Sequence, residues 1–293
     1  MSERFLRSAE PSSLAALIDR FFLSIDYYMI WIILILFILA LVAYILKQMT
    51  LGGIVGAFCL GIVAILAFGF GGLTMYLFFV FGAGLLSHFN KNNEIYKEAK
   101  EVQEKAEKRD LLQVFANGGV GFILAVVYLV YPNPMILLMF GASVAEALSD
   151  TFSGEVGMLM QGKTFSILNG RPMKPGLSGG VSIEGTLGGL LGSLLIALMW
   201  YPIYFSPSIS SISYIAIVTL SGFAGSIVDS LLGLTMQANY YDKEEDRIVE
   251  KEYKNGKKLP LVKGFRIIDN EKVNFISNIF SIILVSLFYI ILL

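Results

Sequence analysis

Runs of about 20 apolar residues recur along almost the whole chain, and they constrain its fold more than any other feature. A helix needs roughly 20 mostly apolar residues to cross the ~30 Å hydrocarbon core of a bilayer. Eight segments meet this requirement, at 28–46, 51–70, 72–88, 112–131, 135–159, 180–204, 212–236 and 273–293. The sequence therefore predicts an all-α, polytopic integral membrane protein, a helical bundle of about eight transmembrane helices.

The residues before the first run differ from the rest because they carry several charges. Residues 12–24 are amphipathic, and their charges argue against a membrane span, so we expect a helix lying in the membrane interface. We interpret 1–27 as an N-terminal amphipathic segment without a cleavable signal. Residues 28–293 then form a single membrane domain.

The basic residues of the connecting segments predict an orientation. Loops 89–111, 160–179 and 239–272 hold most of the Lys and Arg residues, nine of them between Lys243 and Lys272. The connections around Gly71, Pro132–Pro134 and Ser206–Ser211 hold none. Because Lys and Arg near spans stay in the cytosol, an eight-span arrangement places all three basic loops on the cytosolic face.

Two of these loops have local patterns of their own. Residues 94–108 alternate in sign at helical spacing, which favours a solvated helix with i,i+4 ion pairs. The pattern of residues 247–262 predicts two short strands joined by a turn at Asn255–Gly256. Pro260 lacks a backbone N–H, so the second strand is expected at the edge of a sheet.

Composition excludes several kinds of site. Hydrophobic residues make up 56% of the 293 positions and charged residues only 15%, with one cysteine, Cys59, and one histidine, His88. Neither a disulfide framework nor a Cys/His metal site can be built from these. The formal net charge of −1 gives no reason to expect a nucleic-acid partner.

Four carboxylates lie well inside the apolar runs, Glu146, Asp150, Glu155 and Asp229, and a fifth, Glu184, lies near the start of the 180–204 run. Acids in a membrane span are costly and are functional candidates by default. The predicted topology brings them to similar depths near the cytosolic face, with Glu146 the deepest. We expect Asp150, Glu155 and Asp229 to be catalytic and, with Glu146, to bind Mg²⁺ or another hard divalent cation. Pairing with Lys or Arg, or helix capping, is the alternative.

A repeated pattern strengthens this interpretation. Asp150-Thr-Phe-Ser-Gly154 and Asp229-Ser-Leu-Leu-Gly233 share the form Asp-[Ser/Thr]-x-x-Gly, in two spans that run in the same direction. The repeat indicates a duplicated half-site, although small-residue helices also resemble one another by chance.

The loop 170–180 is rich in glycine and runs directly into the sixth span. Glycines allow the backbone to approach a ligand closely, and the first amides of the next helix can bind an anion. We expect this region to hold nucleotide phosphates through Arg171, Lys174, Gly176, Ser178, Gly179 and Gly180, with Glu184 at the helix start. The spacing is not that of a Walker loop.

Two further features have two interpretations each. Asn117 and Asn274, near the cytosolic ends of their spans, suit either hydrogen bonding to the nucleotide or bonding between helices. The Gly185–Gly192 stretch suits close helix packing or room for a lipid chain.

Five motifs, in order, resemble one membrane family. They are RDLLQVFANG at 109–118, ALSDTFSGEVG at 147–157, PGLSGGVSIEGTL at 175–187, GSIVDSLLG at 225–233 and DNEKVNFISN at 269–278. Together they resemble the family of plant phytyl-phosphate kinase and animal transmembrane protein 19, over roughly residues 50–290. The family's acidic and Gly-rich motifs match Asp150, Glu155, Gly179, Gly180, Glu184 and Asp229, whereas the cysteines that some members carry in the last loop are missing here.

The resemblance implies an activity that suits the layout derived from the residues. It implies a kinase that converts an isoprenoid monophosphate of phytyl or geranylgeranyl type to the diphosphate, with CTP as co-substrate. A related lipid cytidylyl or phosphoryl transferase, a polyprenol kinase, or a membrane carrier using the same acids are the alternatives. Expected partners are the isoprenoid phosphate, a nucleoside triphosphate and membrane lipids, and the sequence leaves a homodimer open.

Overall fold

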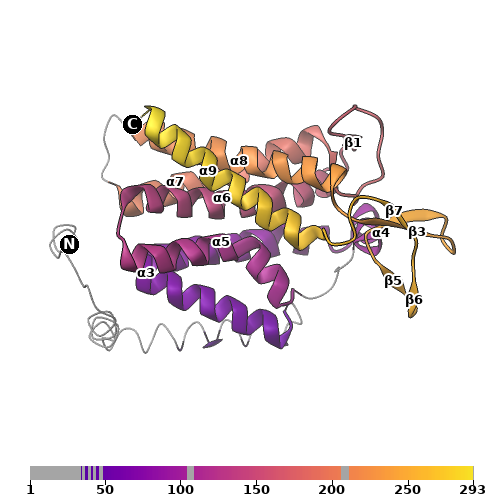
Figure 1. Ribbon diagram of the computed structural model, residues 1–293, viewed down its shortest axis with the longest axis horizontal. Coiled ribbons are helices and arrows are strands. Elements are labelled where there is room, and N and C mark those ends of the chain that lie inside the picture. The colour runs from indigo at the N-terminus through magenta and orange to yellow at the C-terminus, as the bar shows by residue number, and fades with distance from the viewer. Residues whose placement is uncertain are drawn as a thin grey trace.

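The protein is a bundle of long helices with a small strand-rich cap at one end (Figure 1). The computed structural model describes residues 49–103, 109–205 and 211–292, with six isolated positions between 34 and 45. The helices are α3 (Leu51–Asn90), α4 (Glu94–Val102), α5 (Leu111–Val130), α6 (Pro134–Leu159), α7 (Ile183–Tyr204), α8 (Ser211–Thr235) and α9 (Asn270–Leu292). Six of them, all but α4, are long and apolar enough to cross a membrane.

Helix α3 is folded back on itself. Gly69 has non-helical backbone angles, φ 66° and ψ −158°, a conformation open mainly to glycine. Past this point the chain reverses, so that a Cβ on Gly72 would lie 2.8 Å from the carbonyl oxygen of Ala64. Helix α3 thus comprises two arms that pack together, as the sequence predicts for 51–70 and 72–88.

Helix α6 is the centre of the bundle and contacts α3, α5, α7, α8 and α9. Its Leu138, Phe140 and Leu148 are fully buried, together with Trp200 of α7. Small residues bring these two helices together: a Cβ on Gly188 would lie 2.6 Å from Val156 Cβ. The Gly185–Gly192 stretch is therefore a helix-packing face.

Several of the helices begin at residues that cap the free backbone amides of the first turn. Asp110 caps α5 in a reciprocal capping box with Gln113, Asn133 caps α6 just before a proline at its first position, and Ser182 caps α7. Such caps satisfy amides that have no partner inside their helix.

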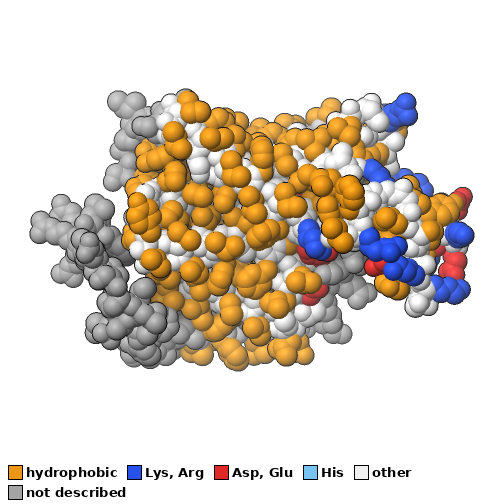
Figure 2. All heavy atoms as spheres, viewed as in Figure 1, with side chains coloured by type: hydrophobic (Ala, Val, Ile, Leu, Met, Phe, Trp, Pro, Cys, Tyr) orange, Lys and Arg blue, Asp and Glu red, His pale blue; other side chains and the backbone are white. Residues whose placement is uncertain are grey.

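The strand-rich cap departs from a purely helical fold. An antiparallel sheet in the order β4-β3-β7 joins Arg247–Val249, Asn239–Asp242 and Leu261–Lys263. Strands β5 (Tyr253–Lys254) and β6 (Lys257–Lys258) form a hairpin, and β1 (Phe165–Ser166) pairs with β2 (Gly180–Val181). Charged side chains gather at this end, whereas the visible flank of the bundle is mostly hydrophobic (Figure 2).

The predicted positions of the later helices are confirmed. Helices α5 to α9 match their predicted spans within a few residues. The Asn255–Gly256 turn is confirmed, with φ of 50° and 76°, but Arg247–Val249 pairs with β3 instead of with the strand after the turn. Residues 1–27, most of 28–46 and 104–108 lie outside the described residues, so the count of eight spans stays a prediction.

Candidate functional site

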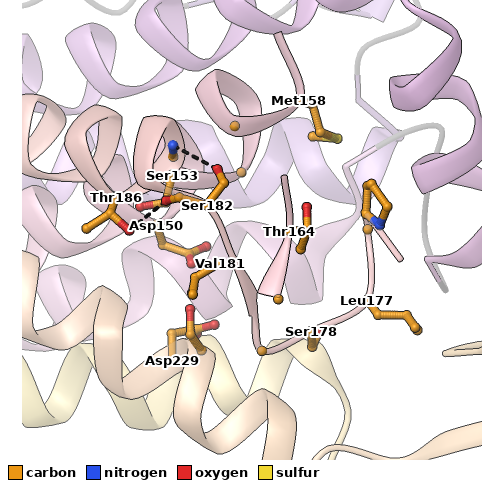
Figure 3. Close-up of a pocket in the computed structure, with 18 of the residues that line it drawn as sticks. Asp150, Ser153, Met158, Thr164, Leu177, Ser178, Val181, Ser182, Thr186 and Asp229 are labelled. Carbon is orange, nitrogen blue, oxygen red and sulfur yellow. Dashed lines mark hydrogen bonds between the residues drawn. The ribbon is translucent and has the colours of Figure 1, made fainter. Parts of the chain in front are cut away.

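A pocket opens at the strand-rich end of the bundle, between α6, α8 and the Gly-rich loop (Figure 3). We call it the Gly-loop pocket. Its lining includes Asp150, Ser153, Gly154, Thr164, Gly176, Ser178, Gly179, Gly180, Ser182, Ser226, Asp229 and Asn270. Ser182 caps α7 by accepting from Gly185 N at 3.0 Å, so the first turn of that helix meets the pocket.

Asp150 and Asp229 both line this pocket, one from α6 and one from α8 (Figure 3). Each is the aspartate of the repeated Asp-[Ser/Thr]-x-x-Gly pattern, and the two helices pack against each other. Ser149 and Ser226 join them through a 2.8 Å hydrogen bond between their hydroxyls. The two aspartates of the repeated pattern therefore line one cavity.

The two aspartates differ in their surroundings. Asp229 is buried, and its Oδ2 lies 3.1 Å from Ser277 Oγ, whose single proton also faces Glu146. The Asn274 amide, oriented to satisfy its donors and acceptors, also donates to Asp229 Oδ2 at 3.0 Å. Asp150 is half-buried and receives no hydrogen bond or ion pair from any residue that the structure describes. Within the described residues, Asp150 thus lies near other acids without a hydrogen bond or ion pair to offset its charge. Such a carboxylate is a candidate for binding a metal ion.

Glu146 lies one turn deeper and does not line the pocket. Its carboxylate accepts from Ser277 Oγ at 2.7 Å and from Asn278 Nδ2 at 2.7 Å. Because Ser277 contacts both Glu146 and Asp229, it couples the buried acid to the pocket. These bonds tie α6 to α9, which supports a structural role for Glu146.

Glu155 points away from Asp229, toward α3 and α4. Its carboxylate accepts from Ser87 Oγ at 2.8 Å and from Asn90 Nδ2 at 2.9 Å, and Tyr96 OH lies 3.4 Å away. Glu155 lines a second cavity next to the first, which we call the polar cleft. Glu155 follows Asp150 by five positions, so the two side chains leave α6 in different directions.

The Gly-rich loop is held in place by its neighbours. Gly176 and Gly179 have φ of 89° and 86°, and a Cβ would lie 2.5 Å from Ala99 Cα in the first case and 2.2 Å from Leu234 Cβ in the second. These glycines thus allow the loop to pack between α4 and α8 as well as to line the pocket. The backbone N–H and hydroxyl of Ser178 donate to Glu250 Oε1, at 3.0 and 2.5 Å.

Four predicted binding residues lie elsewhere. Arg171 and Lys174 are exposed and line neither cavity. Glu184 lies in the first turn of α7, where Gly162 leaves room for its carboxylate. Asn117 donates to Gln113 O within its own helix, at 2.9 Å.

Two cations that the sequence interpretation did not select line the polar cleft instead. Lys100 and Arg109 line the polar cleft together with Asp150 and Glu155. Burial lowers the pKa of the Lys100 ammonium and of the Arg109 guanidinium from their ordinary values, while the charge of Glu155 acts in the opposite direction. Arg109 opens the first family motif, which is the one sequence signal that could have identified it.

The carboxylates suit a divalent ion that arrives with a ligand. Within the described residues, no three Asp, Glu, His or Cys side chains are grouped closely enough to hold a metal ion. Mg²⁺ at phosphoryl-transfer sites is, however, commonly bound by one or two carboxylates plus substrate phosphates. Asp150 and Asp229 fit that arrangement.

Comparison with known proteins identifies the family. The model of the integral membrane protein family DUF92 matches residues 34–282. The chain belongs to this family. No solved structure is significantly similar to it.

Relatives occur in archaea and plants. An uncharacterized membrane protein of Methanocaldococcus jannaschii is 33% identical over 202 residues, covering 69% of this chain and 80% of the relative. Protein PGR of Arabidopsis thaliana is 25% identical over 237 residues, 71% of this chain and 81% of that protein. The chloroplastic protein VTE6 of Arabidopsis thaliana is 27% identical over 232 residues, 77% of this chain but 60% of its own length. These matches confirm the family resemblance read from the five motifs.

Proposed function

We propose that this protein is a kinase that transfers the γ-phosphoryl group of a nucleoside triphosphate to an isoprenoid monophosphate, giving the diphosphate. The observation that supports it is the convergence of Asp150 and Asp229 on one pocket with the Gly-rich loop and the start of α7. Membership in a phytyl-phosphate kinase-like membrane family supports the same reaction class, and the resemblance favours CTP as the donor.

The reaction suits these side chains because it needs positioning and charge neutralisation more than a protein nucleophile. An oxygen of the lipid phosphate attacks the γ-phosphorus of the nucleotide. The bond from that phosphorus to the bridging oxygen breaks, and the nucleoside diphosphate leaves with this oxygen. The acceptor phosphate is already an anion, so no strong base is required.

Each part of the pocket has a role in this scheme. The backbone of the Gly-rich loop and the first amides of α7 bind the nucleotide phosphates. Asp150 and Asp229 would hold Mg²⁺, which would supply positive charge to neutralise these phosphates. We place the pocket on the cytosolic side, because the basic loops surround it and a soluble nucleotide must reach it.

The test is transfer by the purified protein in detergent, with CTP labelled on either the α- or the γ-phosphate and a series of prenyl monophosphates. We expect γ-label, and no α-label, to appear in the prenyl diphosphate. Asp229→Asn should reduce this transfer about 100-fold or more while the protein stays folded. Glu98→Gln, which changes an exposed carboxylate on α4, serves as the matched control.

The alternatives give different products. Transfer of the α-label to the lipid would show a cytidylyltransferase. Prenyl phosphate carried unchanged into vesicles, with no diphosphate formed, would show a carrier. Full activity of Asp229→Asn would refute the assignment of the metal-binding carboxylates.

A further inference from the structure

An apolar groove runs between the two arms of α3 and helix α5, and we call it the α3–α5 groove. Its walls include Ala57, Phe58, Leu73, Leu77, Val80 and Val114. Its polar lining comprises Arg109, Gln113 and Asn117, together with the hydroxyl of Tyr76, which donates to Gly118 O at 3.0 Å. From residue 111 to residue 118, α5 rises about 10 Å, so the groove reaches well into the depth of the spans.

The groove meets the polar cleft at its basic end. Arg109 and Gln113 line both cavities. The polar cleft in turn shares Asp150, Gly154, Met158 and Ser178 with the Gly-loop pocket. Three neighbouring cavities thus lie in sequence from the apolar groove, through the cleft with its two cations, to the aspartate of the proposed nucleotide site.

The polar cleft is lined by four carboxylates, Asp150, Glu155, Glu250 and Glu271, and by two cations, Lys100 and Arg109, which lie at its junction with the groove. Lys100 Nζ lies 5.1 Å from the Tyr96 ring centroid, and the Arg109 guanidinium lies 5.8 Å from that of Phe79. Neither cation forms an ion pair with a carboxylate in the described part of the chain. Glu155, which acts electrostatically on both, is already hydrogen-bonded to α3. Partly buried cations are costly unless an anion approaches them.

We propose that the α3–α5 groove binds the hydrocarbon chain of a lipid monophosphate, and that Arg109 and Lys100 bind its phosphate beside Asp150. This inference rests on the proposed kinase function and assigns its acceptor site. The lipid phosphate and the nucleotide then approach Asp150 from opposite cavities. A planar guanidinium can bind two phosphate oxygens at once, which fixes the orientation of the attacking group.

Steady-state kinetics of Arg109→Gln test the phosphate end. The KM for prenyl monophosphate should rise about 10- to 100-fold, as expected from the loss of one charge-assisted interaction, while the KM for the nucleotide stays within about twofold. Lys97→Gln, an exposed cation on α4, is the matched control and should change neither constant. A selective rise in the nucleotide KM would overturn the proposal and assign these cations to the donor.

Photo-crosslinking tests the groove without depending on catalysis. An alkyl monophosphate with a diazirine in its chain should label residues of α3 and α5, and unlabelled prenyl monophosphate should compete where prenyl alcohol does not. Labelling confined to other helices would overturn the groove assignment even if the kinase is active. Competed labelling of α3 and α5 in a protein without kinase activity would support the lipid site and refute the proposed function.

Discussion

Replacing Asp150 by asparagine should stabilise the protein while removing its activity. Glu146 and Asp150 are four residues apart on α6, and such pairs have Cβ atoms about 5–6 Å apart. Two unit charges about 6 Å apart repel by about 3 kcal/mol at an effective dielectric constant near 20. This is an upper limit, because either carboxylate can take up a proton. Since no described residue hydrogen-bonds to Asp150, we expect the unfolding free energy to rise by about 1–3 kcal/mol.

The assay is reversible unfolding in mixed micelles, followed by circular dichroism, in EDTA and without nucleotide so that no ligand stabilises the folded state. Asp229→Asn is the matched control. Because Asp229 already accepts a hydrogen bond from Asn274 and lies next to the Ser277 hydroxyl, its replacement should stabilise the protein less. A decrease of at least about 1 kcal/mol in the unfolding free energy of Asp150→Asn would refute the reasoning. Such a loss would show that the Asp150 charge has a stabilising partner in the folded protein.

Two further substitutions distinguish a residue that lines the pocket from a residue that holds the surrounding helices together. Gly154 lines both the Gly-loop pocket and the polar cleft, and a Cβ there would meet nothing within 4 Å. Gly154→Leu should therefore leave the stability of the protein unchanged. It should reduce phosphoryl transfer at least about tenfold, because the leucine side chain fills the site. Gly84→Leu, equally open but outside the cavities, is its control, and equal activity of both variants would contradict the assignment. Glu155→Gln should instead lower the unfolding free energy by about 1.5–3 kcal/mol, because one of its bonds to Ser87 or Asn90 loses a charged acceptor; unchanged stability would show that these bonds contribute little.

The helices could be predicted closely because the bilayer imposes a length and a composition on every span. The predicted 112–131, 135–159 and 212–236 correspond to α5, α6 and α8. The pairing of Asp150 with Asp229 also followed from sequence, since a repeated pattern in two spans of the same direction brings equivalent residues to equivalent depths.

Side-chain partners could not be predicted in the same way. Glu155 and Asp150 are near neighbours in sequence, but only the packing of α3 and α4 against α6 shows that Glu155 is hydrogen-bonded to Ser87 and Asn90. Lys100 belongs to a run of alternating charges that favours a solvated helix, and its burial depends on how α4 packs. Conversely, the basic residues of a Gly-rich loop suggest phosphate binding, whereas Arg171 is exposed outside the pocket.

Electron paramagnetic resonance of Mn²⁺, used in place of Mg²⁺, tests the shared metal and nucleotide site most directly. Titration of the purified protein should show tight Mn²⁺ binding that requires CTP, weakened in Asp150→Asn and Asp229→Asn and lost when both changes are combined. Tight, nucleotide-dependent Mn²⁺ binding that persists in the doubly substituted protein would contradict the account.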